Sequence, residues 1–141
     1  MSVISYHRRS ANEKNIEELK EDTNFWSETF HEQTEEIVFI KTLLTSNIFE
    51  NSIPNLFEKL QEFFDELMDC KETKINLEEL VRNHKNDLNG MMECEDISCE
   101  AFYHSQHEKL HSRIDQHRIR FQGLKMRIFK FVTPLLKNNQ E

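Results

Sequence analysis

Apolar residues recur at alternating spacings of three and four along three long stretches of this sequence. Such spacing places them on one face of an α-helix, as in a coiled coil. Only 2 Gly and 2 Pro occur in 141 residues, so few positions end a helix and the helices must be long. We therefore predict an all-α protein of three long antiparallel helices, an up-down-up bundle or coiled coil over residues 12–137. Residues 1–11 are expected to be a flexible lead-in and residues 138–141 a tail.

The expected core is the set of residues at these spacings, which we call the seam of each helix. In the first helix the seam is Ile16, Leu19, Thr23, Trp26, Phe30, Gln33, Ile37, Ile40 and Leu44. In the second it is Leu56, Leu60, Phe63, Leu67, Cys70, Lys74, Leu77, Val81, His84, Leu88 and Met91, widened by Phe57 and Phe64. In the third it is Tyr103, His107, Leu110, Ile114, His117, Phe121, Leu124, Ile128, Phe131 and Leu135.

Residues with known preferences for helix ends predict the boundaries. The first helix should fray near residues 46–49. The segment 51–54 (Asn-Ser-Ile-Pro) reads as the start of the second helix, with Asn or Ser as the cap and Pro in the first turn. Gly90 is expected to end that helix in the left-handed conformation. Asp96 or Ser98 should cap the third helix, and Pro134 should end it near residues 132–133.

The charge of the chain argues against two classes of partner. The net charge is −8, which disfavours nucleic acid and anionic membrane surfaces. No apolar run approaches the roughly 20 residues of a membrane span, and no apolar signal-peptide segment follows the N-terminus. Residues 101–137, however, carry eight basic and two acidic side chains. Five of the basic residues flank the seam, at positions that face neighbouring helices: Arg113, Arg118, Arg120, Lys125 and Arg127. They favour a basic helix packed against two acidic ones over a nucleic-acid stripe.

The three cysteines, Cys70, Cys94 and Cys99, show no metal-finger spacing. Cys94 and Cys99 flank an acidic connection and could oxidise to each other, but spare thiols are the favoured interpretation. A reduced protein in the cytoplasm is therefore predicted.

Polar residues inside the seams are the candidates for chemistry. An antiparallel register with its second turn centred near residues 94–95 places His84 level with His104 and His107, and a first turn centred near residue 50 places residues 16–20 level with His84. His111 lies one turn further, and Glu17 on the first helix is nearby. Imidazoles with a carboxylate suit zinc or iron, so these five residues form a candidate metal site. The favoured alternative is that they are neutral core histidines, hydrogen-bonded to neighbours, that set the register.

A second polar layer is predicted from Cys70 and His117, with His31 on the first helix. Gln33 and Lys74 are expected to snorkel, pair or specify register. Two Glu-x-x-His pairs, at residues 28–31 and 108–111, match part of a di-iron motif, but the register separates them by several turns. A conventional di-iron centre is therefore not expected, and no nucleophile constellation or phosphate loop is present in the sequence.

Four phenylalanines, Phe25, Phe39, Phe49 and Phe129, fall off the seams. Such a surplus of large apolar side chains suggests burial against a second copy of the chain. The leading functional hypothesis is a helical interaction or scaffold protein that self-associates as a dimer or binds another protein. The alternative is a helical bundle that binds a metal or a small ligand through its histidines.

The sequence also resembles a known group of proteins. The segments Trp26-Ser27-Glu28, Leu56 to Phe64 and His104 to Leu110 are similar to a family of small uncharacterised helical proteins from flavobacteria. The resemblance covers about residues 12–137. It implies three helices and nothing about catalysis.

Overall fold

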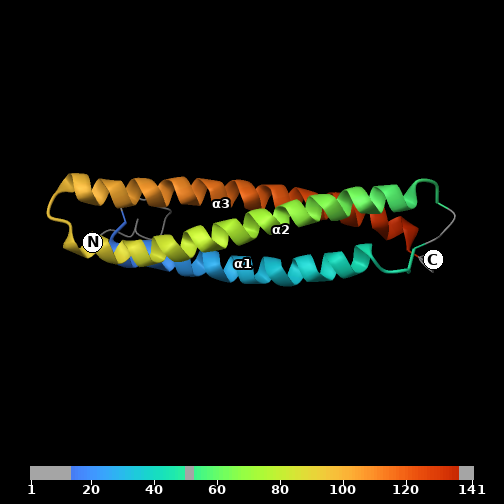
Figure 1. The fold of residues 1–141 in the computed structure, drawn as a ribbon, viewed down its shortest axis with the longest axis horizontal. Coiled ribbons are helices and arrows are strands. Elements are labelled where there is room, and N and C mark those ends of the chain that lie inside the picture. The colour runs from blue at the N-terminus through green and yellow to red at the C-terminus, as the bar shows by residue number, and fades with distance from the viewer. Residues whose placement is uncertain (1–13, 50–52, 137–141) are drawn as a thin grey trace, which may run out of the picture. The chain divides into compact units, whose positions relative to one another are not determined.

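The computed structural model describes residues 14–49 and 53–136. Three α-helices occupy most of them: α1 (Ile16–Leu44), α2 (Leu56–Asp87) and α3 (Ile97–Val132) (Figure 1). Two 3₁₀ helices follow α2 and α3, namely η3 (Leu88–Glu93) and η4 (Thr133–Leu135). The described residues form no strand beyond one isolated bridge between Phe49 and Leu136. The predicted all-α fold is confirmed, while the expected lead-in (1–11) and tail (138–141) lie outside the described residues.

Two helix starts have side-chain caps. Before α1, Asn15 Oδ1 accepts from Glu18 N at 2.9 Å and Glu18 Oε1 accepts from Asn15 N at 3.0 Å, which is a reciprocal capping box. Before α3, Asp96 Oδ1 accepts from Cys99 N at 2.8 Å. This confirms Asp96 as the cap. The predicted end of α3 before Pro134 is also confirmed, because α3 stops at Val132.

The predicted role of Gly90 is wrong. The α2 helix ends earlier, at Asp87, and Gly90 lies inside η3 without a positive φ. A Cβ atom built on Gly90 would lie 2.6 Å from the Tyr103 hydroxyl oxygen, closer than real Cβ contacts. A side chain at this position would therefore require Tyr103 to shift, and glycine permits the close approach of the Tyr103 side chain to the backbone rather than a left-handed turn.

The left-handed position is instead Asn55, just before α2, with a φ of 60°. Pro54 lies in the preceding turn rather than in the first turn of the helix, and the expected caps at 51 and 52 lie outside the described residues. Because Asn55 is exposed, substitution there changes mainly the backbone strain. We expect Asn55→Gly to be neutral or to stabilise the fold by up to about 1 kcal/mol, and Asn55→Ala to destabilise it by about 1 kcal/mol. Urea unfolding of the two variants measures this, and equal midpoints would contradict it.

The described residues fall into two compact units. Unit 1 contains the described residues within 1–30 and 76–115, and unit 2 contains those within 31–75 and 116–141. Each unit contains a segment of all three helices. The prediction of a single domain over 12–137 stays a prediction.

In unit 1 the core has two clusters. The larger consists of Trp26, Phe30, Leu77, Val81, Leu110 and Ile114. The smaller consists of Leu19 and Leu88, with Met91 and Tyr103 packed against them. The Lys20 ammonium donates to Asn89 and the Lys85 ammonium to Asn24, each at 2.7 Å. Later residues of α1 thus face earlier residues of α2, so the two segments are antiparallel.

In unit 2 one apolar cluster joins the three helix segments and the connection after α1. Phe49 of that connection is buried with Leu56 and Leu60 of α2. Two basic residues of α3 pair with acids of its neighbours: Lys125 with Glu36 of α1 and Arg127 with Glu66 of α2, each at 2.8 Å. The prediction that basic residues of the third helix face acidic neighbours is therefore confirmed for Lys125 and Arg127.

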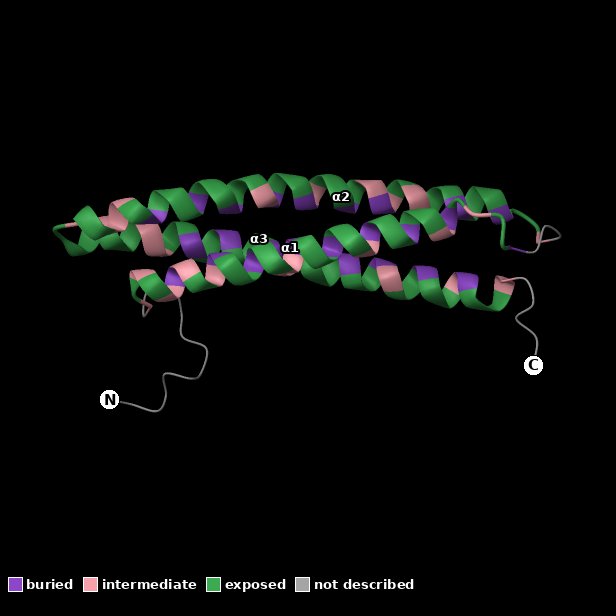
Figure 2. Cartoon of the chain, turned by 90° about the horizontal axis from the view of Figure 1, so that it is seen from below, coloured by how far each residue is buried: buried purple, intermediate pink, exposed green. Residues whose placement is uncertain are grey.

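The seams predicted from the sequence are the buried stripes of the helices (Figure 2). Only seam positions near helix ends are half-buried, namely Ile16, Met91, Tyr103, Phe131 and Leu135. The prediction that Phe57 widens the core is wrong, because this side chain is 73% exposed. It follows Leu56 directly, and one residue turns a helix by about 100° away from the buried face.

Candidate functional site

A line of four polar side chains crosses unit 1. Lys14 Nζ lies 2.7 Å from Asp22 Oδ2, and the same oxygen lies 2.9 Å from His107 Nε2. On the other edge of its ring, His107 Nδ1 lies 2.8 Å from His84 Nε2. His84 and His107 are both buried, whereas Asp22 is partly exposed. The three helices therefore each contribute one member of an Asp22–His107–His84 chain.

The Asp22 carboxylate at one end of the chain fixes the proton on the nearest ring nitrogen of His107. A carboxylate only accepts hydrogen bonds, so His107 Nε2 must carry a proton and donate it to Asp22. While His107 is neutral, it presents a lone pair at Nδ1, and His84 Nε2 then donates to it. His84 in turn keeps its lone pair on Nδ1. In this state the free edge of His84 is a hydrogen-bond acceptor.

Burial and neighbouring charge set the protonation of the chain. Burial, and then repulsion from the His107 ring when it is also protonated, lowers the pKa of His84 to about 4, so His84 is neutral at pH 7. Burial alone would raise the pKa of Asp22, but the hydrogen bonds from His107 and Lys14 outweigh it and the pKa is lowered. Asp22 is accordingly a carboxylate, as the proton assignment requires.

Trp26 covers the same group from α1. Its ring stacks on His107 with centroids 4.8 Å apart and lies 5.7 Å from His111. The indole thus holds the His107 ring in place from one side, while Asp22 and His84 hold its two nitrogens.

A hollow of about 340 Å³ lies beside His84, between α2 and α3. Its apolar lining is Leu80, Phe102 and Leu110, and its polar lining is Asn83, His84, Asp87, Tyr103, Gln106, Lys109 and Arg113. The hollow therefore combines a carboxylate, two cations and an apolar wall next to the end of the hydrogen-bonded chain.

The predicted metal ligands are only partly brought together. His84 and His107 bond to each other, His104 Nε2 lies 3.0 Å from the Lys14 carbonyl oxygen, and His111 packs by Trp26. Glu17 is exposed. Within residues 14–49 and 53–136, no group of three or more His, Cys, Asp and Glu side chains is arranged to hold a metal ion. The zinc or iron hypothesis stays a prediction.

Asp22 was missed because the register between α1 and α2 is shifted. The sequence placed residues 16–20 level with His84, whereas Lys85 contacts Asn24. Lys20 likewise contacts Asn89, so the same offset holds at both of these contacts. Phe49 of the connection after α1 is buried in one cluster with Leu56 and Leu60 of α2. The two helices are displaced by about two turns. No pattern in the sequence marks Phe49 as a residue that folds back.

The second polar layer, in unit 2, has different members from those predicted. His117 Nε2 lies 2.9 Å from Gln33 Oε1, and both side chains are buried. Burial first, and then the charges of Arg120 and Lys74, lower the pKa of His117. Lys74 is itself buried. Gln33 and Lys74, expected to pair or to set register, therefore form this layer with His117.

The other two predicted members lie elsewhere. Cys70 is buried in the apolar cluster of unit 2, where burial raises the pKa of its thiol. His31 is exposed and lies 3.6 Å from Glu35, one turn along α1. His31 lies beside the seam of α1 and not on it, so its side chain faces solvent.

Two hollows of unit 2 border α1 on different sides. The first, of about 500 Å³ between α1 and α3, is lined by Glu32, Glu35, Glu36, Phe39, Ile40, Lys125 and Phe129. The second, of about 400 Å³ between α1 and α2, is lined by Thr34, Ile37, Val38, Lys41, Thr42, Thr45, Lys71 and Lys74. We call them the acidic hollow and the basic hollow.

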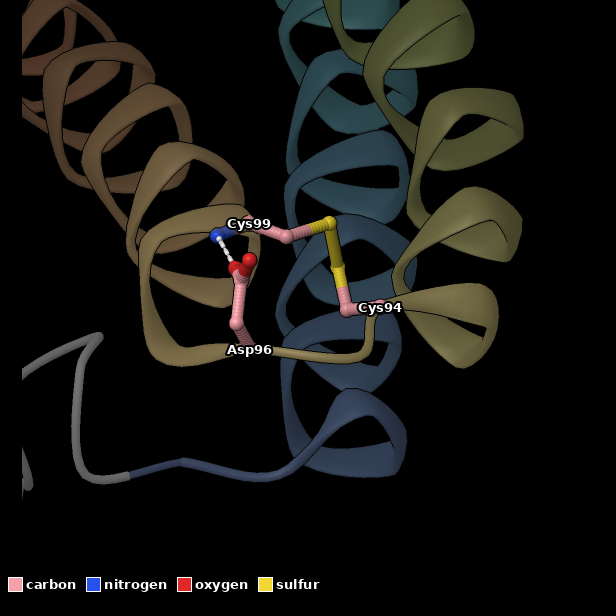
Figure 3. Close-up of a disulfide and its surroundings, with 3 residues drawn as sticks. All are labelled: Cys94, Asp96 and Cys99. Carbon is pink, nitrogen blue, oxygen red and sulfur yellow. Dashed lines mark hydrogen bonds between the residues drawn. A yellow bond between two sulfur atoms is a disulfide. The ribbon is translucent and has the colours of Figure 1, made fainter.

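Cys94 and Cys99 form a disulfide at the start of α3 (Figure 3). The favoured interpretation of spare thiols is therefore wrong for this pair. The cap explains the proximity: Asp96 bonds to Cys99 N and starts the helix, which turns Cys99 back towards Cys94. Cys70 is the free thiol among the described cysteines. The cytoplasmic location stays a prediction.

No family model, curated protein or solved structure matches the chain. The resemblance to flavobacterial proteins therefore stays a prediction, and the function has to be argued from the geometry. In the described part of the chain, no helix has the length and apolar character that crossing a membrane requires.

Proposed function

We propose that this chain is a helical interaction module that self-associates, with the acidic hollow of one copy against the basic hollow of another. The observation that carries the proposal is the pair of large aromatic side chains at the acidic hollow. Phe39 is 63% exposed and Phe129 is 39% exposed, and both line this one hollow. Exposed apolar side chains that gather at a concave site are typical of protein–protein contacts.

The four off-seam phenylalanines divide into two groups. Phe49 is buried within unit 2, so the chain itself accounts for it. Phe25, Phe39 and Phe129 are exposed and need another explanation. Phe39 and Phe129 share a hollow, which makes them the better candidates for a contact.

Charge complementarity favours a second copy as the partner. The acidic hollow has three glutamates, of which Glu36 is paired with Lys125. The basic hollow has two exposed lysines, Lys41 and Lys71, and no acidic lining residue, and its exposed apolar side chain is Val38. Opposite charges around apolar centres are what two complementary faces need. A contact between two different faces is heterologous, so it permits growth beyond a dimer.

Exchange of charges between the two faces tests this contact. Glu35→Lys leaves two acidic and two basic side chains at the acidic hollow, and Lys71→Glu places one acidic side chain among the lysines of the basic hollow. We expect each variant alone to self-associate at least about tenfold more weakly than the wild type, because the attraction between the oppositely charged faces is then reduced. An equimolar mixture of the two variants should regain association, since each supplies the charge that the other lacks. Sedimentation equilibrium at low salt measures all three samples.

Aromatic truncation supplies the matched control. Phe39→Ala should weaken self-association by about tenfold, whereas Phe57→Ala, which removes a phenylalanine that is even more exposed but lies outside both hollows, should leave it unchanged. A wild-type protein that remains a monomer, or a mixture of the charge variants that stays dissociated, would overturn the proposal.

A further inference from the structure

The hollow beside His84 has three chemically different parts. Asp87 lies in the last turn of α2, and Lys109 and Arg113 lie on α3. Leu80, Phe102 and Leu110 supply apolar lining. Sites for small molecules commonly combine an apolar wall with a few placed polar groups.

The two kinds of charge are at opposite ends of the hollow. In unit 1, His84 contacts His107 and the later residue Gly90 lies against the earlier residue Tyr103, so α2 and α3 are antiparallel there. Asp87 lies three residues after His84, which is about 4.5 Å along the axis of α2 in one direction. Arg113 lies six residues after His107, which is about 9 Å along the axis of α3 in the opposite direction. Lys109 lies on the same side as Arg113. A bound molecule therefore meets a carboxylate at one end and cations at the other.

His84 adds a requirement between those ends. Its Nε2 is occupied by His107, and while His107 is neutral the hydrogen bond to Asp22 orders the protons so that His84 Nδ1 keeps a lone pair. In that state the free edge of His84 can accept a hydrogen bond from a ligand but cannot donate one. Asp87 acts on His84 electrostatically, so the two acceptors are close together.

We infer that this hollow binds an elongated zwitterion, whose ammonium group lies between Asp87 and His84 and whose carboxylate faces Lys109 and Arg113. A short apolar segment of the ligand would pack on Phe102 and Leu110. The ammonium group satisfies both acceptors at one end, which a simple organic acid leaves unpartnered. The carboxylate of the ligand pairs with the cations at the other end of the hollow, and a simple amine would leave those cations without a partner. The inference is independent of self-association, because the two hollows proposed for that contact are lined by other residues.

The probe is 6-aminohexanoate, which carries both charges on a five-methylene chain, with hexanoate and hexylamine as matched molecules that each lack one charge. Histidine side-chain ¹⁵N NMR of the full chain follows the titration. We expect 6-aminohexanoate to shift the His84 resonances with a millimolar Kd, and each single-charge molecule to bind at least about fivefold more weakly.

Two exposed positions test the assignment of the ends without unfolding the protein. Asp87→Asn should weaken 6-aminohexanoate binding about five- to tenfold and leave hexanoate binding unchanged. Arg113→Gln should weaken 6-aminohexanoate and hexanoate alike and leave hexylamine unchanged. Arg127→Gln, which removes a basic residue of α3 in unit 2, is the control and should change none of the three. Equal binding of all three molecules, indifference to both variants, or no shift at about 10 mM would overturn the inference.

Discussion

Phe121→Ala is expected to lower the free energy of unfolding by about 3–5 kcal/mol. The Phe121 side chain is 2% exposed and belongs to the large apolar cluster of unit 2. Its ring is parallel to that of His117 at 6.3 Å, and Lys125 Nζ lies 5.0 Å from its centroid. Truncation removes the buried area, leaves a cavity and deprives His117 of a packed neighbour. Such a loss is a large fraction of the 5–15 kcal/mol that stabilises a typical domain.

The matched variant is Phe57→Ala. Both phenylalanines were expected in the core, but Phe57 is 73% exposed. Its truncation should change the free energy of unfolding by less than about 0.5 kcal/mol. Chemical denaturation followed by far-ultraviolet circular dichroism compares the two variants at one protein concentration. Similar losses for both would mean that Phe57 is buried in solution, by this chain or by another copy.

The difference between these two residues shows what periodicity can predict. Phe121 lies on the three-and-four spacing of its helix, and burial follows from that spacing because all side chains at it share one face. Phe57 was added to the core on hydrophobicity alone, and its position on the helix turns it outwards. Spacing therefore predicted the buried stripes well, whereas apolar character away from the spacing was right for Phe64, which packs against the core, and wrong for Phe57.

The candidate site was only partly predictable, for a reason of register. His84 and His107 were placed level with each other because the connection between α2 and α3 is short. Asp22 was not found, because α1 and α2 pair with an offset of about two turns from the predicted register, as the contact between Lys85 and Asn24 shows. Periodicity within a helix carries no information about the offset between helices. The Cys94–Cys99 bond depends likewise on a tight cap, which a count of cysteines does not reveal.

The fold should lose about 3 kcal/mol of stability as the pH falls from 6.5 to 4, because His84 is buried as a neutral ring. Burial and the neighbouring His107 lower its pKa from 6.5 to about 4. Between these values the unfolded chain binds a proton at this residue and the folded chain does not, so the free energy of unfolding falls with decreasing pH. The lowered pKa of His117 adds loss of the same sign. Asp22 contributes in a lower range, since its stabilisation is lost only as the pH falls below 3.8.

The substitution His84→Gln isolates the effect. A glutamine amide can still donate to His107 Nδ1 but does not titrate, so the variant should be less stable than the wild type at pH 7 and have a flatter dependence on pH. His31→Gln, at an exposed histidine, should leave the dependence as in the wild type. Urea unfolding at several pH values between 7.5 and 4 measures the slopes. If His84→Gln keeps the full slope, His84 does not stay neutral in the fold. In that case the proton order from Asp22 through His107, and with it the acceptor edge offered to a ligand, would also be wrong.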